Sequence, residues 1–247
     1  MQSVSARGLT AMPSVETRLR QVDWTIVARG LDERGWATTP PLLTAAECAE
    51  LIALYPEDDR FRSRVDMARF RFGEGQYKYF ANPLPPAVLA LRRHAYPRLA
   101  PIADAWSVAL GGKPAYPPDL DGFLATCAEN GQTRPTPLLL RYEVGGYNCL
   151  HQDLYGRIAF PLQMTCLLSR RGEDFTGGEF LLVEQRPRAQ SRGEVVPLEQ
   201  GQIVIFATRE RPVRGARGVY RVALRHGVSR VTAGLRYTLG VIFHDAE

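Results

Sequence analysis

The second half of the chain is built from short, apolar, β-rich segments separated by glycine-containing turns. Eight such segments follow Pro137, over residues 138–144, 147–153, 159–169, 178–184, 194–198, 202–208, 219–228 and 235–243. The turn signals between them are Gly145-Gly146, Gly177-Gly178, Gly201, Gly215 and Gly234. Strands at this spacing are typical of a β-sandwich or jelly roll. The sequence therefore predicts a mainly β core over residues 137–247.

The first half has a different pattern and is expected to form helices packed on that core. Apolar residues recur at helical spacing over 15–35 and again over 118–130. A short strand is expected at 35–43, between two helical segments. No linker composition marks the junction, so residues 1–136 are interpreted as a mainly helical support within one compact unit.

Two further helices of this region carry recognisable boundary signals. One begins with a capping box, in which Thr44 precedes an apolar run and Glu47 follows three residues later. Another segment, 84–110, is helical in pattern but contains Pro97 and Pro101. Because proline lacks the N–H that a helix interior needs, this segment predicts one or two helices broken at the prolines.

Composition excludes several classes of protein. Of the 247 residues, 45% are hydrophobic and 23% charged, as in ordinary globular proteins and unlike disordered chains. No apolar stretch approaches membrane-spanning length, and the first residues lack the apolar core of a signal peptide. The four cysteines form no CxxC pair, so neither a zinc site nor a disulfide scaffold is indicated. Scattered thiols fit a reducing compartment, and a cytoplasmic location without a membrane partner is expected.

The positive charge is concentrated in one part of the sequence. The chain carries a net charge of +5, and all but two of its 31 basic residues are arginines. Segment 186–230 holds ten arginines and three acids, so it carries +7 while the remainder is slightly acidic. Genomic base composition explains a preference for arginine. A surface that binds phosphates or carboxylates would explain both the preference for arginine and its concentration in this segment.

The most informative short motif is His151-Gln152-Asp153. On a strand, residues i and i+2 point to the same face, so His151 and Asp153 are expected to project together. An imidazole and a carboxylate are two thirds of the facial triad that binds Fe(II) and leaves coordination positions open. The alternative is a surface pair on a strand edge. His94 and His244 have no comparable partner and are interpreted as structural.

Further residues complete a candidate site around this motif. His226 ends a β-like run and could supply the second imidazole from a distant strand, or simply bond the backbone. Arg236 and Thr238 share one strand face, where a guanidinium fork and a hydroxyl suit a carboxylate. Tyr142 could add another hydroxyl to that carboxylate, or serve as a core tyrosine.

These elements occur in an order found in a known superfamily. The segments are LLRYEVGGYNCLHQD, FTGGEFLLVE, VVPLEQGQIVIF and RHGVSRVTAGLRYTL. Over residues 137–245 the chain resembles the Fe(II)/2-oxoglutarate-dependent dioxygenases, in their prolyl-hydroxylase-like branch. As a whole it is similar to a bacterial oxygenase family predicted to demethylate damaged DNA oxidatively. The resemblance implies a double-stranded β-helix, a form of jelly roll, as the catalytic core over 137–247.

The same resemblance implies the cofactors and the role of each site residue. His151, Asp153 and His226 would ligate Fe(II), and Arg236, Thr238 and Tyr142 would hold 2-oxoglutarate. The implied reaction uses O2 to hydroxylate a C–H bond while 2-oxoglutarate is decarboxylated to succinate and CO2, with ascorbate as a candidate reductant. The alternative from another class of function is an inactive binding module on the same fold, although such a module need not keep both the three metal ligands and the residues that would hold 2-oxoglutarate.

One interpretation of the substrate is an N-alkylated base in DNA or RNA. RYEVGGYNCLHQD is similar to the iron-binding stretch of AlkB-type demethylases, which repair nucleic acids. The arginine-rich segments 60–71 and 186–230 could hold phosphates. In segment 60–79, arginines alternate with phenylalanines and tyrosines, a mixture that can stack bases. The alternative is an amphipathic segment with aromatics packed inward and arginines outward.

The sequence departs from the AlkB pattern in ways that keep a second interpretation open. Leu140 stands where that family has an asparagine, and Ile242 where it has a second arginine. The spacing from His226 to Arg236 is also shorter, as in prolyl hydroxylases. The alternative substrate is therefore a protein side chain or a small metabolite, with the arginine-rich loops gripping an acidic partner or a carboxylate.

Overall fold

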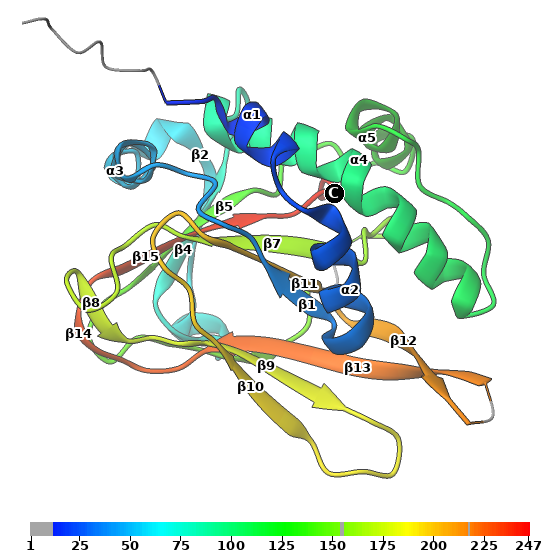
Figure 1. Ribbon diagram of the computed structural model, residues 1–247. Helices are drawn as coiled ribbons and strands as arrows, with labels where there is room; N and C mark the ends of the chain where they lie inside the picture. Colours follow the sequence, from blue (N-terminus) through cyan, green and yellow to red (C-terminus); the bar gives the residue numbers. More distant parts are fainter. Residues whose placement is uncertain (1–11, 154–155, 217) are drawn as a thin grey trace, which may run out of the picture.

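The protein folds into two antiparallel β-sheets packed face to face, with its helices gathered on the outer side of the larger sheet (Figure 1). The computed structural model describes residues 12–153, 156–216 and 218–247. The helices are α1 (Val15–Arg20), α2 (Trp24–Arg34), α3 (Ala45–Ala53), α4 (Pro86–Ala109) and α5 (Leu120–Glu129). This confirms the predicted fold class, a mainly β jelly-roll core that carries N-terminal helices.

The larger sheet has seven strands in the order β1-β11-β7-β15-β5-β4-β2. The strands are β1 (Trp36–Thr38), β2 (Phe61–Asp66), β4 (Gln76–Phe80), β5 (Leu138–Tyr142), β7 (Leu162–Leu167), β11 (Ile203–Ala207) and β15 (Arg236–Val241). In β11, Ile203 and Ile205 belong to the core beneath the helices, whereas Val204 and Phe206 belong to the core between the sheets. Burial on both faces explains why this strand is apolar throughout.

The smaller sheet has the order β10-β9-β13-β6-β3, and β12 pairs with residues 218–223 of β13. These strands are β3 (Gly73–Glu74), β6 (Tyr147–His151), β9 (Phe180–Gln185), β10 (Arg192–Val196), β12 (Glu210–Gly215) and β13 (Gly218–Val228). A separate pair joins β8 (Phe175–Gly177) to β14 (Val231–Gly234). Phe180, Leu182 and Val228 face the larger sheet and help to form the core between the two sheets.

The N-terminal region contributes strands to both sheets as well as helices. Strand β1, which the sequence predicted, pairs with β11 at one edge of the larger sheet. Strands β2 and β4 extend its other edge, where β4 pairs with β5. Strand β3 pairs with β6 at the edge of the smaller sheet. The turn between β2 and β4 thereby reaches across from one sheet to the other.

Helix α4 corrects one expectation, because it runs unbroken through both Pro97 and Pro101. Its buried face includes Leu91, Ala95 and Leu99, which pack into the core beneath the larger sheet. This packing outweighs the loss of one backbone donor at each proline. Like the other helices within the described ranges, α4 does not combine the length and the apolar character needed to cross a membrane.

Candidate metal centre

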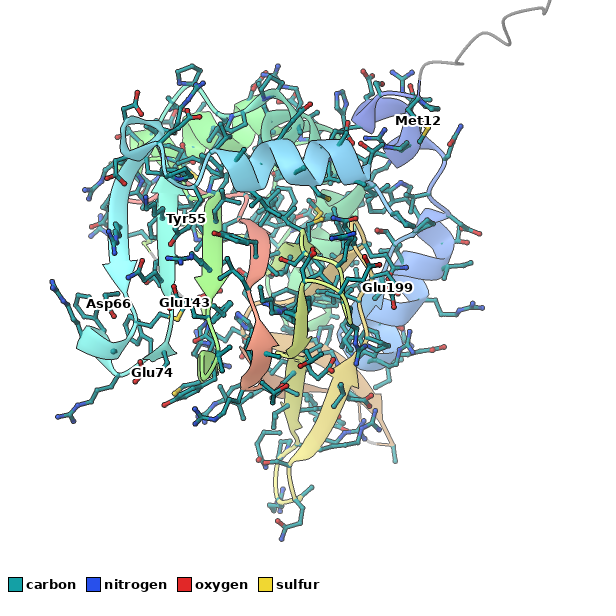
Figure 2. The ribbon with its side chains drawn as sticks, turned by 90° about the vertical axis from the view of Figure 1, so that its left-hand side faces the viewer. Met12, Tyr55, Asp66, Glu74, Glu143 and Glu199 are labelled. Carbon is teal, nitrogen blue, oxygen red and sulfur yellow. The ribbon has the colours of Figure 1, made fainter. Side chains whose placement is uncertain are left out.

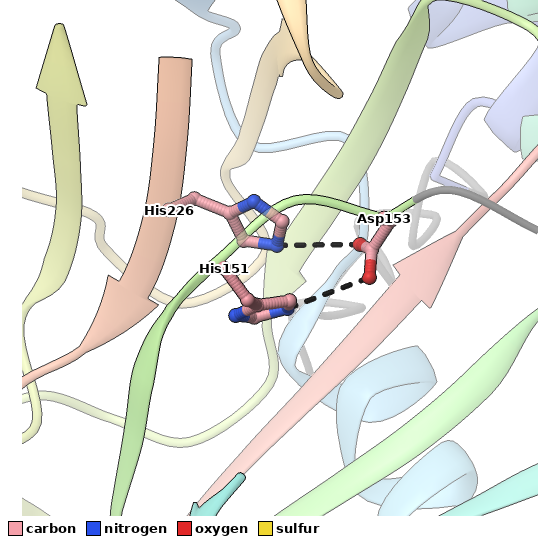
Figure 3. Close-up of side chains that lie close together, drawn as sticks. All are labelled: His151, Asp153 and His226. Carbon is pink, nitrogen blue, oxygen red and sulfur yellow. Dashed lines mark ion pairs between the residues drawn. The ribbon is translucent and has the colours of Figure 1, made fainter. Parts of the chain in front are cut away.

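Two histidines and one aspartate from neighbouring strands meet between the sheets. His151 ends β6, Asp153 follows two residues later, and His226 lies on β13 directly opposite His151. His151 Nε2 is 3.4 Å from Asp153 Oδ1, and His226 Nε2 is 3.3 Å from Asp153 Oδ2 (Figure 3). One donor atom from each residue lies within 4.8 Å of the others, and no other group of three metal-ligating side chains does so in the described part of the chain.

Neighbouring groups orient these side chains. His151 Nδ1 lies 2.8 Å from the Cys149 carbonyl, and as the donor of that hydrogen bond it leaves the Nε2 lone pair toward Asp153. Gln163 Nε2 donates a 2.7 Å hydrogen bond to Asp153 Oδ2. His226 Nδ1 is buried without a hydrogen-bond partner among the described residues. The hydrogen bonds with the Cys149 carbonyl and Gln163 thus orient His151 and Asp153, as neighbouring groups orient the ligands of a metal site.

Electrostatics favour an ionised Asp153 and a neutral His226. Burial alone would raise the pKa of Asp153, but the charges and hydrogen bonds of His226 and His151 outweigh burial and hold that pKa well below its usual range. Burial lowers the pKa of His226, whereas Asp153 raises the pKa of His151 against the effect of burial. A carboxylate and a neutral imidazole are the forms that bind metal ions.

This donor set fits iron. Two imidazole nitrogens and one carboxylate oxygen on one side of an ion are the set that Fe(II) oxygenases use, and the rest of the coordination sphere stays open. The three side chains also line a cavity of about 440 Å³ between the sheets. That volume lies within the ordinary range for small-molecule sites, so the open side of the triad faces space for a ligand.

The same cavity is lined by Arg236, Thr238 and Tyr142. Arg236 begins β15 directly opposite Tyr142 of β5, and Thr238 lies two residues further along the same face. The guanidinium carbon of Arg236 lies 5.5 Å from the centre of the Tyr142 ring and 5.7 Å from that of Phe175. The structure therefore brings together, around one cavity, all six residues that the sequence singled out.

Arg236 is a buried cation that forms no ion pair with any residue that the structure describes. Its side chain is 1% exposed, and its Nε and Nη1 have no hydrogen-bond partner among the described residues. Burial lowers the pKa of Arg236 to about 10 and raises that of the neighbouring Tyr142 hydroxyl to about 12. Because an unpaired buried charge is costly, these donors indicate a site for an anionic group such as a carboxylate.

Sequence reasoning missed Gln163, which the structure places in contact with the triad. Its amide nitrogen bonds Asp153 and lies 3.3 Å from His226 Nε2. The available signal was a single amide within the apolar segment 159–169, since an uncharged polar residue at a buried strand position needs a partner. The two apolar departures from the AlkB pattern, Leu140 and Ile242, also line the cavity.

The arginines of segment 186–230 lie largely on two hairpins that project from the smaller sheet, β9-β10 and β12-β13 (Figure 1). Several are paired with acids nearby, namely Arg186 with Glu184, Arg192 with Glu194 and Arg221 with Glu210. Others are exposed and have no ion-pair partner among the described residues, namely Arg188, Arg214 and Arg225. Only part of the +7 charge is therefore available to a polyanion.

Sequence comparisons identify relatives of this chain. Residues 75–246 match a family described as an oxygenase catalysing oxidative methylation of damaged DNA. Uncharacterized proteins from two strains of Mycobacterium tuberculosis, CDC 1551 and H37Rv, are each 51% identical over 167 residues. These matches cover 68% of this chain and 72% of each relative.

Solved structures share the fold at low sequence identity. A 2-oxoglutarate–Fe(II) oxygenase family oxidoreductase from Burkholderia pseudomallei matches with a TM-score of 0.53 and 17% identity, over 91% of both chains. A Trichoplax adhaerens prolyl hydroxylase, solved with a hypoxia-inducible-factor peptide, matches with a TM-score of 0.52 and 15% identity, over 94% of this chain and 92% of its own. Both the fold and the predicted resemblance are thus confirmed, and the extent of the family match shows that the chain belongs to the oxygenase family described as acting on damaged DNA.

Proposed function

We propose that the protein is an Fe(II)- and 2-oxoglutarate-dependent dioxygenase that removes alkyl groups oxidatively from bases in nucleic acid. The observation that carries the proposal is the shared cavity, whose walls hold both the triad and Arg236, a buried cation with no ion pair to the described residues. A metal-binding set and a buried carboxylate site in one cavity match the needs of a chelating 2-oxo acid. The family description supports damaged DNA as the substrate.

In this proposal each residue has a separate task. His151, Asp153 and His226 hold the iron, and Gln163 keeps the Asp153 carboxylate in position. When bound, iron and 2-oxoglutarate supply the oxidising power, with decarboxylation to succinate coupled to C–H hydroxylation. Arg236 donates to the distal carboxylate of 2-oxoglutarate.

Thr238 and Tyr142 complete the carboxylate pocket with their hydroxyls. Both residues are buried, at 2% and 0% exposure, and both line the cavity. Hydroxylation of an N-methyl group gives a hemiaminal, which releases formaldehyde and restores the base. The target base must leave its stack to enter a cavity between two sheets.

A second candidate is hydroxylation of a protein side chain or a small metabolite. It is favoured by Leu140 and Ile242, which make the wall of the cavity apolar where AlkB-type enzymes have polar residues. An inactive binding module is less well supported, because it has no need for a buried, unpaired Arg236 beside a metal triad.

The decisive experiment measures demethylation and succinate together. Oligonucleotides with 1-methyladenine or 3-methylcytosine are incubated aerobically with the protein, Fe(II), 2-oxoglutarate and ascorbate, and both products are followed by mass spectrometry. We expect loss of the methyl group in equal amount to succinate, and neither product with His151→Ala. Succinate without any change in the oligonucleotide would instead favour a protein or metabolite substrate.

A further inference from the structure

Two phenylalanines stand exposed beside the candidate site. Phe70 and Phe72 are 57% and 46% exposed, although phenylalanine is usually buried. Their rings are stacked on each other, with centroids 5.5 Å apart and planes inclined by 20°. They lie in the turn between β2 and β4, whose two ends are marked by Asp66 and Glu74 in Figure 2. We call this pair the aromatic platform.

Backbone hydrogen bonds fix the turn that carries the aromatic platform. Met67, which is fully buried, accepts hydrogen bonds through its carbonyl from the N–H groups of Phe70 and Phe72, both at 3.1 Å. Arg71, between the two rings, adopts φ 60°, a left-handed conformation that arginine rarely takes. The Phe72 carbonyl accepts a 2.8 Å bond from Cys149 N, two residues before His151. A surface fixed in this way loses little conformational entropy when it binds a partner.

The platform lies at the edge of the catalytic cavity. Arg71 and Phe72 belong to the same cavity wall as the triad, and so does Leu150, which is 43% exposed. A polymer that crosses the platform therefore presents its neighbouring unit to the candidate metal centre. Phe72 belongs both to the platform and to the cavity wall, so the two surfaces meet at this residue.

The two arginines beside the rings indicate which kind of polymer the platform would bind. Arg69 and Arg71 are exposed, and neither side chain has an ion-pair or hydrogen-bond partner among the described residues, whereas Arg64 of the same hairpin bonds Gln76. Of the two nearby acids, Asp66 accepts a hydrogen bond from the N–H of Ala68 at the start of the turn. Exposed rings flanked by two guanidinium groups that form no ion pair within the described ranges fit a chain of aromatic bases joined by phosphates.

We propose that Phe70, Phe72, Arg69 and Arg71 bind single-stranded nucleic acid, with bases next to the target stacked on the rings and their phosphates held by the arginines. The inference rests on the proposed function and makes it more specific. Stacking on the rings requires bases that are free of a partner strand, so the substrate is single-stranded where it crosses the platform. A proline-rich peptide also packs on aromatic rings, but it offers no backbone phosphates to the two arginines.

The test measures binding without turnover. Fluorescence anisotropy follows a labelled single strand of about 12 nucleotides, a length in the range of known single-strand sites, added to the full chain without 2-oxoglutarate. We expect the double variant Phe70→Ala/Phe72→Ala to bind about tenfold or more weakly. Arg69→Gln/Arg71→Gln should lower the salt dependence, the slope of log K against log[salt], by about 1.4. Matched controls on the helical side, Ile26→Ala and Arg98→Gln, should bind as the parent does.

A third variant reports the contact itself. In Phe72→Trp, emission of the new indole should be quenched when a base stacks on it, by comparison with the same variant without oligonucleotide. If the parent binds the strand but neither double variant differs from it, the platform is wrong and the proposed function stands. If the parent binds no oligonucleotide yet forms succinate with another substrate, both the platform and the nucleic-acid substrate are wrong.

Discussion

His151 and Asp153 show how far a short spacing can predict a site. Because side chains alternate along a strand, the spacing of two residues predicted that His151 and Asp153 point the same way. In the structure the two side chains do lie together, although Asp153 lies just beyond the end of β6. The sequence suggested His226 as a second imidazole but could not show that it lies opposite His151, because the register between distant strands is not a local property. No local pattern in the sequence predicts that Arg236 is buried without an ion-pair partner in the described part of the chain.

At Arg236 we expect substitution to act on 2-oxoglutarate and not on the metal. Arg236→Leu removes charge-assisted hydrogen bonds, each worth about 1.5–3 kcal/mol, so KM for 2-oxoglutarate should rise at least tenfold. Arg236→Lys keeps the charge and should recover part of the affinity. Iron affinity, measured without 2-oxoglutarate, should match the parent in both variants. Equal 2-oxoglutarate affinity in Arg236→Leu and parent would contradict the assignment.

Gln163 gives a second prediction at this scale. Its hydrogen bond to Asp153 orients a proposed metal ligand, and loss of such outer contacts typically weakens metal binding about 10–100-fold. Gln163→Leu should show this loss in a Co(II) titration followed by visible absorption. Thr165→Val, on the same strand and in the same cavity, serves as the control and should bind Co(II) like the parent.

At the scale of elements, the sequence predicted the strands of the second half that are mainly apolar and missed those that are not. Each of the eight predicted segments contains a strand, whereas β8, β12 and β14 were missed. Those three carry glycine, proline or arginine, and neighbouring strands define them more than their own residues do. Helix α4 shows the converse, because tertiary packing preserved a helix that two prolines were expected to break.

The capping box of α3 is an element whose energy can be tested. Thr44 Oγ1 accepts from Glu47 N at 3.2 Å, and Glu47 Oε2 accepts from Thr44 N at 2.7 Å, as the sequence predicted. Thr44→Ala should lower the free energy of unfolding by about 1 kcal/mol in urea titrations. Thr133→Ala, at an exposed position without a capping role, should change it by less than about 0.5 kcal/mol. Similar losses in both variants would argue against the cap.

At the scale of the whole molecule, the strands of the N-terminal region were the main omission. Segment 60–79 lacks regular alternation, and its strands exist because β4 pairs with β5 and β3 with β6. Of the two interpretations of its aromatics, inward packing fails for Phe70 and Phe72, which face solvent. Docking of a distant segment onto a sheet edge depends on non-local register, which composition does not specify.

His244 links the stability of the whole molecule to pH. It is fully buried, as expected of a structural histidine, and its Nδ1 accepts from Phe160 N at 3.2 Å. Burial, together with the nearby charge of Arg92, lowers the pKa of His244 from 6.5 to about 4. The unfolded chain therefore binds a proton first as the pH falls. The stability that neutral His244 contributes is complete above about pH 6.5 and is lost toward pH 4, at about 1.4 kcal/mol per pH unit.

The comparison with His244→Gln isolates this effect from other titrating groups. Urea unfolding of both proteins at pH 7.5, 5.5 and 4.5 should show the advantage of the parent shrinking as the pH falls. A difference that stays constant over this range would mean that His244 titrates alike in the folded and unfolded chains.

The direct pairing of His151 with His226 also has a thermodynamic consequence. The two imidazoles come from segments far apart in the chain and become neighbours only when β6 and β13 are joined. An ion held by both side chains would bind the folded protein and not the unfolded chain, so it would raise the free energy of unfolding with the logarithm of its concentration. The residues that would bind the catalytic metal would then also make the stability of the protein depend on the concentration of that metal.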